Sequence, residues 1–242
     1  MTTAIVIAGG MGRRMGLPIP KQFIPVEGKP VIIYTLLNLQ NTPEIDEIVI
    51  VVPEGWAEVL QPQIEEYGVT KATQIVNGGS CRQESVHNGI LALKGRTKDD
   101  DVLCFLDANR PMVSPDLIQK NLAQLASGDL SISLGASLDS IYMSTDGKTV
   151  DQLCDRNTIY RGLGPESVRF KDALTVSTRA KDDGVKDFPL TVLMLHYGYH
   201  VVASEGSVRS FKITTQEDLD MFRAYLLLDA QKASEIAEAE RK

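Results

Sequence analysis

Cysteine is scarce in this 242-residue chain, which has only Cys81, Cys104 and Cys154, widely spaced. Three scattered cysteines exclude a disulfide framework, and none stands in the close pairs that structural zinc sites use. We therefore expect reduced thiols and a cytoplasmic protein.

Long apolar runs are missing too. The longest, around residues 45–52, is interrupted by Asp46 and Glu47 and is far shorter than the roughly 20 residues that a membrane-spanning helix needs. The first residues lack the pattern of a signal peptide. No membrane is therefore expected as a partner.

Positively charged residues are fewer than negatively charged ones. The chain has 25 Lys and Arg residues and 32 Asp and Glu residues, for a formal net charge of −7. This balance argues against nucleic acid or an anionic membrane surface as a partner. A local cluster of positive charge in such an acidic chain indicates an anion-binding site.

An alternating α/β pattern is present. Strand-like apolar runs are expected at residues 4–8, 47–52, 73–76 and 102–106, and helices at 30–40, 57–67, 83–93 and 115–126. Continuous apolar strands separated by amphipathic helices predict a mostly parallel sheet covered on both faces. We expect one three-layer, Rossmann-like α/β domain over residues 1–242.

The pattern changes after residue 140. Residues 140–151 predict a β-hairpin with Asp146-Gly147 in its turn. Because an isolated hairpin is marginal in water, we expect residues 138–162 to form an arm that either folds back on its own domain or reaches a second copy of the chain. A helix is expected from residue 215 to about 228, followed by a helical tail at 229–242.

The first expected strand runs into a glycine-rich loop, Ala8-Gly-Gly-Met-Gly-Arg-Arg-Met-Gly16, and Lys21 follows. Glycines let backbone N–H groups approach an oxyanion closely, and Arg13, Arg14 and Lys21 add full positive charge. The spacing matches neither a P-loop nor the dinucleotide fingerprint. The loop predicts polyphosphate binding; the alternative is a structural turn.

A second loop, Gly78-Gly-Ser-Cys-Arg-Gln-Glu-Ser-Val-His-Asn-Gly89, also follows an expected strand. Its glycines let a ligand approach the backbone closely. Ser85 lies near a helix start, where its hydroxyl can contact a base edge. Helix capping by Ser80 or Ser85 is the alternative.

The third motif is Leu106-Asp-Ala-Asn-Arg-Pro111. Asp107 follows a strand at the sheet edge where open α/β sheets bind ligands. A single carboxylate there suits Mg²⁺ when phosphates complete the coordination. The alternative is an ion pair with Arg110 that ties the loop.

These motifs, together with Phe211-Lys-Ile-Thr-Thr-Gln-Glu-Asp-Leu219, resemble the family of methylerythritol phosphate and ribitol-5-phosphate cytidylyltransferases. The resemblance spans nearly the whole chain. It implies a nucleotidyltransferase that transfers CMP from CTP to the phosphate of a small polyol, releases pyrophosphate and uses Mg²⁺. It also implies a homodimer formed through the arm.

The resemblance assigns roles to individual residues. Those implied to be catalytic are Arg14, Lys21 and Lys212. Those implied to bind the nucleotide are Ala8, Gly9, Gly10, Gly12, Arg13, Gly79, Ser80, Ser85, Asp107 and Ala108, with Asp107 also the Mg²⁺ ligand. Those implied to bind the acceptor are Arg156, Arg110 and Thr214, with Arg156 gripping its phosphate across the dimer interface.

The chemistry does not require a general base, because a phosphate monoester with a second pKa of about 6 is already mostly dianionic at neutral pH. Catalysis then depends on positioning and charge neutralisation. Of the three histidines, His196 and His200 are expected on a strand, and His87 is expected to pack or give polar support.

Departures from the family pattern concentrate in the acceptor half. Residues 161–167 keep only the proline of the usual Gln-Thr-Pro-Gln, Phe188-Pro189 replaces a Thr-Asp pair, and Arg209 stands where an acid is frequent. In the nucleotide half, Leu106 replaces a histidine. Other details, such as Pro53-Glu-Gly-Trp56, favour a ribitol 5-phosphate-like acceptor. Methylerythritol phosphate, another phosphorylated acceptor, and a non-catalytic nucleotide-binding homologue stay open.

Overall fold

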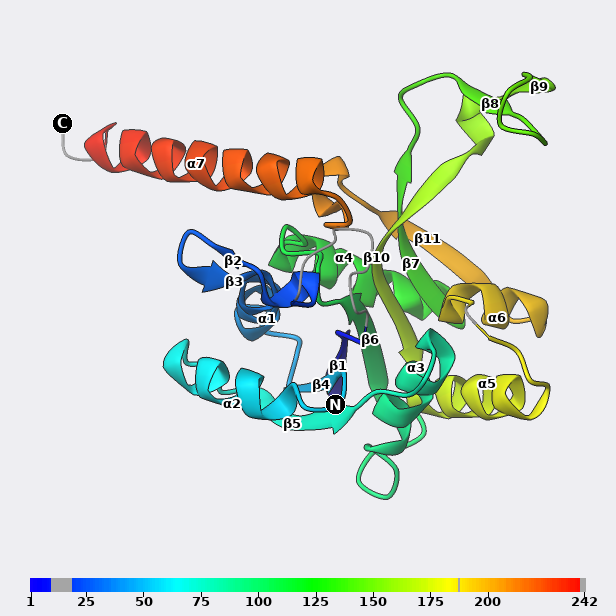
Figure 1. The fold of residues 1–242 in the computed structure, drawn as a ribbon. Helices are drawn as coiled ribbons and strands as arrows, with labels where there is room; N and C mark the ends of the chain where they lie inside the picture. Colours follow the sequence, from blue (N-terminus) through cyan, green and yellow to red (C-terminus); the bar gives the residue numbers. More distant parts are fainter. Residues whose placement is uncertain (10–18, 187, 240–242) are drawn as a thin grey trace.

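A seven-stranded sheet forms the centre of the molecule (Figure 1). The computed structural model describes residues 1–9, 19–186 and 188–239. In spatial order β11-β7-β10-β6-β1-β4-β5, the strands are β11 (Val201–Glu205), β7 (Leu130–Ala136), β10 (Tyr160–Arg169), β6 (Val102–Asp107), β1 (Thr2–Ile7), β4 (Glu47–Val52) and β5 (Ala72–Asn77). β10 is antiparallel to β6 and β7, whereas the other neighbouring pairs are parallel. The prediction of a mostly parallel sheet is confirmed.

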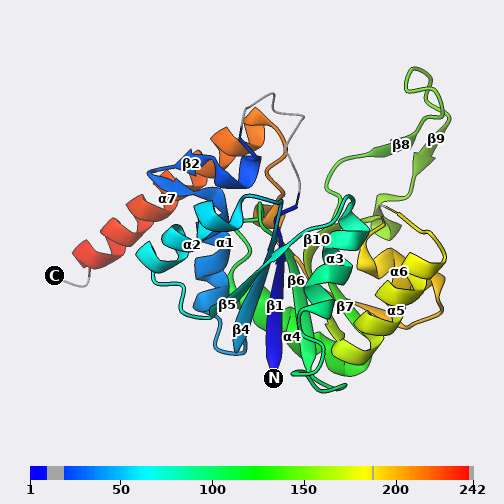
Figure 2. The ribbon, with the colours of Figure 1, turned by 60° about the horizontal axis from the view of Figure 1, so that its bottom comes forward.

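Helices cover both faces of this sheet (Figure 2). One face packs against α1 (Val31–Gln40), α2 (Ala57–Glu66) and α4 (Pro115–Gln124). The other packs against α3 (Arg82–Leu91), α5 (Phe170–Asp182) and α6 (Leu190–His196). Along β1, Ala4 and Val6 face the first set and Ile5 and Ile7 the second. Two-sided burial explains why the strands read as continuous apolar runs, and the three-layer expectation is confirmed.

The arm is an insertion between β7 and β10, and it stands away from the body of the molecule (Figure 1). Its strands β8 (Ile141–Met143) and β9 (Gln152–Cys154) pair in antiparallel fashion, with Ile141 opposite Cys154. The predicted hairpin at residues 140–151 was therefore too short. Residues 144–151 form a polar loop, in which Asp146 accepts hydrogen bonds of 2.7 Å from two backbone N–H groups. At the base, Tyr160 already pairs with Ala136 of β7 and belongs to the central sheet.

The helix α7 (Gln216–Ala239) extends past residue 228 as one continuous helix. Its first turns pack on α1, where Phe222 lies edge-on against Tyr34 with ring centres 5.0 Å apart. Its later turns project from the body (Figure 1). Across the described ranges, no helix is both long and apolar enough to traverse a bilayer.

Shorter elements connect these layers: the strands β2 (Pro25–Val26) and β3 (Lys29–Pro30), and the 3-10 helices η2 (Lys21–Phe23), η3 (Leu125–Ser127), η4 (Arg156–Thr158) and η5 (Val208–Ser210). The predicted strand containing His196 and His200 was wrong. His196 ends α6, and Gly198, with φ of 84°, turns the chain toward β11. A left-handed glycine just past a helix is a common terminator, because it lacks the Cβ that disfavours this conformation.

Candidate functional site

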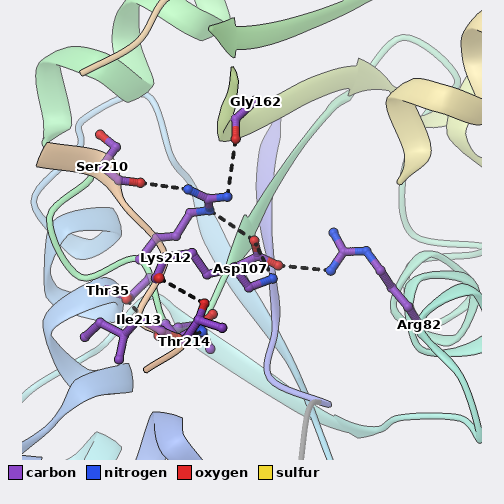
Figure 3. Close-up of polar contacts among 11 residues, drawn as sticks. Thr35, Arg82, Asp107, Gly162, Ser210, Lys212, Ile213 and Thr214 are labelled. Atoms are coloured by element: carbon purple, nitrogen blue, oxygen red, sulfur yellow. Dashed lines mark hydrogen bonds and ion pairs between the residues drawn. The ribbon is translucent and has the colours of Figure 1, made fainter. Parts of the chain in front are cut away.

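Asp107 ends β6 and contacts three cationic side chains from different parts of the chain. Its Oδ1 lies 3.0 Å from Nη1 of Arg82, the first residue of α3. Its Oδ2 lies 3.1 Å from Nε of Arg110 and 3.1 Å from Nζ of Lys212. Figure 3 shows Asp107 between Arg82 on one side and the Lys212 segment on the other. The fold thus joins the second, third and fourth sequence motifs at one carboxylate.

The electrostatics of this cluster favour an anion. Burial alone would raise the pKa of Asp107, but the charges of Lys212, Arg82 and Arg110 outweigh it and hold that pKa well below its usual range. Asp107 is therefore ionised at neutral pH. Three cations around one carboxylate leave an excess of positive charge at the carboxyl edge of the sheet, where phosphates are expected to bind.

The loops that carry Arg110 and Lys212 are tied to one another. Nη1 of Arg110 donates to the carbonyl of Ser210 at 2.7 Å. Backbone N–H of Ile213 donates to the carbonyl of Asn109 at 2.9 Å, and the Asn109 amide donates back to the carbonyl of Ile213. These bonds hold the two cations in place without a ligand.

Ala108 and Thr214 belong to this frame. The Thr35 hydroxyl donates to the carbonyl of Ala108 at 2.9 Å. The hydroxyl of Thr214 donates to the carbonyl of Lys212 at 3.0 Å, and its N–H donates to Asp218 at the start of α7. Both residues therefore shape the backbone around Asp107 and Lys212.

Ser85 joins the ends of β1 and β5. Its Oγ accepts from backbone N–H of Gly79 at 3.1 Å and donates to the carbonyl of Cys81 at 3.0 Å. A Cβ on Gly9 would lie 3.1 Å from the same oxygen, and one on Gly78 would lie 2.9 Å away. A side chain at Gly78 would displace this hydroxyl, and one at Gly9 would press tightly against it.

The capping alternative for the second loop is wrong. The N-cap of α3 is Cys81, without a side-chain capping bond. Backbone N–H of Ser80 donates to the carboxylate of Glu84 at 2.6 Å, so Ser80 also serves the loop rather than the helix end.

The first loop is described only at its two ends. Gly10, Gly12, Arg13 and Arg14 lie outside the described residues, and their roles stay predictions. On the near side, N–H of Ala8 donates to the carbonyl of Val51 at 2.7 Å, which continues the strand pairing. On the far side, the Gln22 amide donates to the carbonyl of Ala8. This bond holds η2, and with it Lys21, near the end of β1.

Arg156 is not brought to this cluster within one chain. It follows β9 on the arm, is exposed, and donates to the carbonyl of Leu138 at 3.2 Å. Arg209, which replaces a frequent acid, interacts with α7 instead: Nη2 lies 2.8 Å from Asp229, and the guanidinium lies 4.4 Å from the Tyr225 ring centre. The position where an acid is frequent in the family therefore holds an arginine that binds to α7 in this chain.

Two residues of the site were not assigned from the sequence. Arg82 stands in the second motif, and its position at a helix start after a Gly-Gly turn was the available signal. Glu166 is the single acid in an otherwise apolar or small-residue strand segment, and it lines the same cavity as Asp107. The Asp107–Arg110 ion pair expected as an alternative is present. Arg82 and Lys212 also contact Asp107, so the carboxylate does more than hold its own loop in place.

The residues fit Mg²⁺ only together with phosphates. Among the described residues, no group of three or more His, Cys, Asp or Glu side chains could hold a metal. Asp107 can still act as a single metal ligand, because a carboxylate has about four lone-pair sites and keeps some after accepting N–H bonds. Mg²⁺ commonly binds through one or two carboxylates plus substrate phosphates.

Comparisons with known proteins identify the family of the chain. The family profile described as IspD, 2-C-methyl-D-erythritol 4-phosphate cytidylyltransferase, matches residues 2–228. A ribitol-5-phosphate cytidylyltransferase of Lacticaseibacillus paracasei is 34% identical over 93% of this chain and 98% of its own length. A 2-C-methyl-D-erythritol 4-phosphate cytidylyltransferase of Clostridium botulinum is 33% identical over 90% of this chain and 93% of its own.

Solved structures show the same fold. The 4-diphosphocytidyl-2C-methyl-D-erythritol synthase of Anaerococcus prevotii superposes with a TM-score of 0.80 at 25% identity, covering 94% of this chain and 98% of that one. The match over residues 2–228 and the full-length relatives lead to one conclusion. The chain belongs to the 2-C-methyl-D-erythritol 4-phosphate cytidylyltransferase (IspD) family and is a nucleotidyltransferase of the cytidylyltransferase class.

Proposed function

We propose that the protein transfers CMP from CTP to the phosphate of a small polyol, of the ribitol 5-phosphate kind, to give a CDP-polyol and pyrophosphate. The observation that carries the proposal is the excess of positive charge around the ionised Asp107 at the carboxyl edge of the sheet. The ribitol-5-phosphate relatives, at 30–34% identity along the whole chain, support this acceptor.

In the proposed reaction, an oxygen of the acceptor phosphate attacks the α-phosphorus of CTP. The new P–O bond forms as the bond to pyrophosphate breaks, and pyrophosphate leaves with its electron pair. No general base is needed because the attacking phosphate is already mostly dianionic. Lys212, Lys21 and Arg14 offset the charge that builds on the transferring phosphoryl group, and Arg110 holds the acceptor phosphate.

The nucleotide is proposed to lie along the first two loops. Gly79, Ser80 and Ser85 contact the base, and the loop containing Ala8, Gly9, Gly10, Gly12 and Arg13, together with Ala108, surrounds the triphosphate. Mg²⁺, held by Asp107 with the phosphates of CTP, would supply further charge neutralisation when bound.

The arm is proposed to form a homodimer. Its exposed apolar side chains are Leu138, Tyr142, Met143, Val150 and Leu153. An exposed apolar surface of this kind favours association, and a two-fold dimer would present each Arg156 to the other copy's acceptor phosphate. We place the enzyme in the cytoplasm, since unpaired cysteines suit a reducing compartment, with neither nucleic acid nor membrane as a partner.

Methylerythritol 4-phosphate is the second candidate acceptor, favoured by the family profile and the Clostridium botulinum relative. A non-catalytic nucleotide-binding role is the candidate from another class, suggested by the divergent acceptor half. Lys21, Asp107 and Lys212 argue against it, because nucleotide binding alone does not need all three.

Pyrophosphate release with CTP, Mg²⁺ and a panel of polyol phosphates tests the proposal. Ribitol 5-phosphate is expected to give the highest kcat/KM. A higher value with methylerythritol 4-phosphate would support the second acceptor. Tight CTP binding without release for any acceptor would favour the binding role and contradict the enzymatic one.

A further inference from the structure

A cavity of about 500 Å³ opens beside Asp107 and extends along the face of the sheet that α3, α5 and α6 cover. Phe105, Ile132 and Glu166 line it from the strands. Arg82 of α3 and Leu190 of α6 line it from the helices. The cavity therefore begins at the cation cluster and continues into a mostly apolar interior.

Glu166 is unusual in this interior. In the sheet it pairs with Phe105 on β6 and with Ile132 on β7. Burial raises the pKa of Glu166, an effect that the charge of Arg82 partly offsets. Within the described part of the chain, no ion pair includes Glu166. Its hydrogen-bonding partner in the protein is Thr191 of α6, which donates from its side chain and its backbone. A carboxylate has about four lone-pair sites, and Glu166 lines the cavity. Sites on this costly buried carboxylate therefore remain for a ligand group that donates to it.

The depth of Glu166 fits the length of a small polyol. Its pairing partner Phe105 lies two residues before Asp107 on β6. At a rise of about 3.3 Å per residue, Glu166 lies roughly 7 Å deeper in the cavity than Asp107. If the acceptor phosphate sits at Arg110 and Lys212, its carbon chain must cross this distance. At about 1.5 Å per bond, roughly three to five carbons do so.

The charges at the two ends of the cavity select different groups. The mouth, at Arg110 and Lys212, favours the phosphate. At the inner end, Glu166 disfavours a second anion, and the neighbouring Arg82 disfavours a cation such as an ammonium group. A neutral hydroxyl is compatible with both side chains, because it carries no charge and can donate a hydrogen bond to the Glu166 carboxylate.

We propose that Glu166 determines acceptor specificity: its carboxylate accepts a hydrogen bond from a hydroxyl of the polyol chain, which enters the cavity with its phosphate at the cation cluster. The inference rests on the proposed function and names how the acceptor is recognised. Glu166 touches the acceptor away from the reacting atoms, and it leaves CTP binding to the two loops.

The test combines two Glu166 variants with acceptors that each lack one hydroxyl. Wild-type enzyme, Glu166→Gln and Glu166→Leu are compared by kcat/KM for the polyol phosphate and for its monodeoxy analogues. Glu205→Gln, which alters an exposed carboxylate on β11 of the same sheet, is the matched control. Circular dichroism and thermal unfolding check that each variant folds. If Glu166→Leu does not fold, the test rests on Glu166→Gln, whose side chain has nearly the same shape as that of glutamate.

One deoxy analogue is expected to lose about 10–100-fold in kcat/KM with wild-type enzyme, the range for a hydrogen bond to a charged group. Glu166→Leu should lose a similar factor with the complete acceptor and little more with that analogue, while the KM for CTP stays unchanged. Glu166→Gln should show an intermediate loss, because its amide oxygen can still accept.

Three results would overturn the inference while CMP transfer itself persists. These are unchanged acceptor kinetics in both variants, a loss that falls on the KM for CTP, and a preference for an acceptor that carries an ammonium group. Absence of CMP transfer to every acceptor by the wild-type enzyme would instead overturn the proposed function, and this inference with it.

Discussion

At the scale of single residues, the site is a set of cations held in place by the protein before any ligand arrives. Arg82, Arg110 and Lys212 reach one carboxylate from three segments, and backbone carbonyls fix Arg110. Such pre-set charges can stabilise a transition state without reorganising when the reaction occurs. This arrangement is what we expect of an enzyme that relies on charge neutralisation instead of acid–base chemistry.

Replacement of Lys21 tests this view. Lys21→Ala is expected to lower kcat by about 10²–10³ with the fold intact, the range for removal of one group that stabilises transition-state charge. Steady-state kinetics of pyrophosphate release, with circular dichroism as the fold check, measure it. Lys232→Ala, on the projecting part of α7, is the matched control and should behave as wild type. Near-normal turnover by Lys21→Ala would refute a catalytic role for this lysine.

The residue scale also shows where sequence-based prediction stopped. Asp107, Lys212 and Ser85 were assigned from the sequence because each stands in a recognisable local motif, and the structure brings Asp107 and Lys212 together. The contact of Arg82 with Asp107 was missed, since it joins residues distant in sequence and no local pattern encodes such a pair. Glu166 was missed for a related reason: its meaning depends on a cavity built by several elements. Arg13 and Arg14 stay predictions.

At the scale of elements, the bounds of a strand or helix could be predicted where the element is buried. β4 is buried along its whole length, and its position was predicted to the residue, because burial on both faces leaves a continuous apolar run. The strands of the arm are largely exposed, so no such pattern fixed their register, and the predicted hairpin ended too early. The four predicted helices, α1 to α4, end within two residues of their predicted bounds. α5 was not predicted, and the segment of α6 that contains His196 was predicted as a strand.

Glu47 links three strands and gives a prediction about stability. Its carboxylate on β4 accepts hydrogen bonds from Thr3 on β1 at 2.8 Å and Thr73 on β5 at 3.0 Å, and it pairs with Arg96 at 2.8 Å. Burial alone would raise the pKa of Glu47, but the bonds from Arg96, Thr3 and Thr73 outweigh this effect and lower it from 4.5. Ionised Glu47 therefore stabilises the folded state.

Glu47→Gln is expected to lower the free energy of unfolding by about 1–3 kcal/mol at neutral pH. Because the folded pKa lies below the unfolded one, the contribution is present above a pH of about 4.5 and is lost as the pH falls through the folded pKa. Denaturant unfolding at several pH values measures the difference. Glu54→Gln, in an exposed loop, should show little effect at any pH. A gap between Glu47→Gln and wild type that widens with acidity would contradict this reading.

At the scale of the whole molecule, the proposed dimer completes the site. The arm carries Arg156 away from its own Asp107 cluster, so a phosphate-binding role requires a second copy (Figure 1). A closed two-fold dimer would supply one Arg156 to each site. The two copies would then depend on one another for activity.

Mixed dimers test this dependence. Arg156→Ala and Lys21→Ala are each expected to be strongly impaired. Co-expressed with two different tags, they should recover about one quarter of wild-type activity, because about half of the dimers are mixed and one of the two sites in each is intact. Steady-state activity of the unfractionated mixture measures the recovery, and the mixed dimer isolated through its two tags should show about one half of wild-type activity. No recovery would mean that Arg156 acts within its own chain or not at all.

The central claim is that the acceptor phosphate is the nucleophile on the α-phosphorus of CTP, and an oxygen-labelling measurement tests it most directly. Ribitol 5-phosphate carrying ¹⁸O in its phosphate is incubated with CTP, Mg²⁺ and the enzyme, and the products are identified by mass spectrometry. All of the label is expected in a CDP-polyol, and the pyrophosphate should be unlabelled. Label in the pyrophosphate, or consumption of CTP without a CDP-polyol, would contradict the proposed reaction.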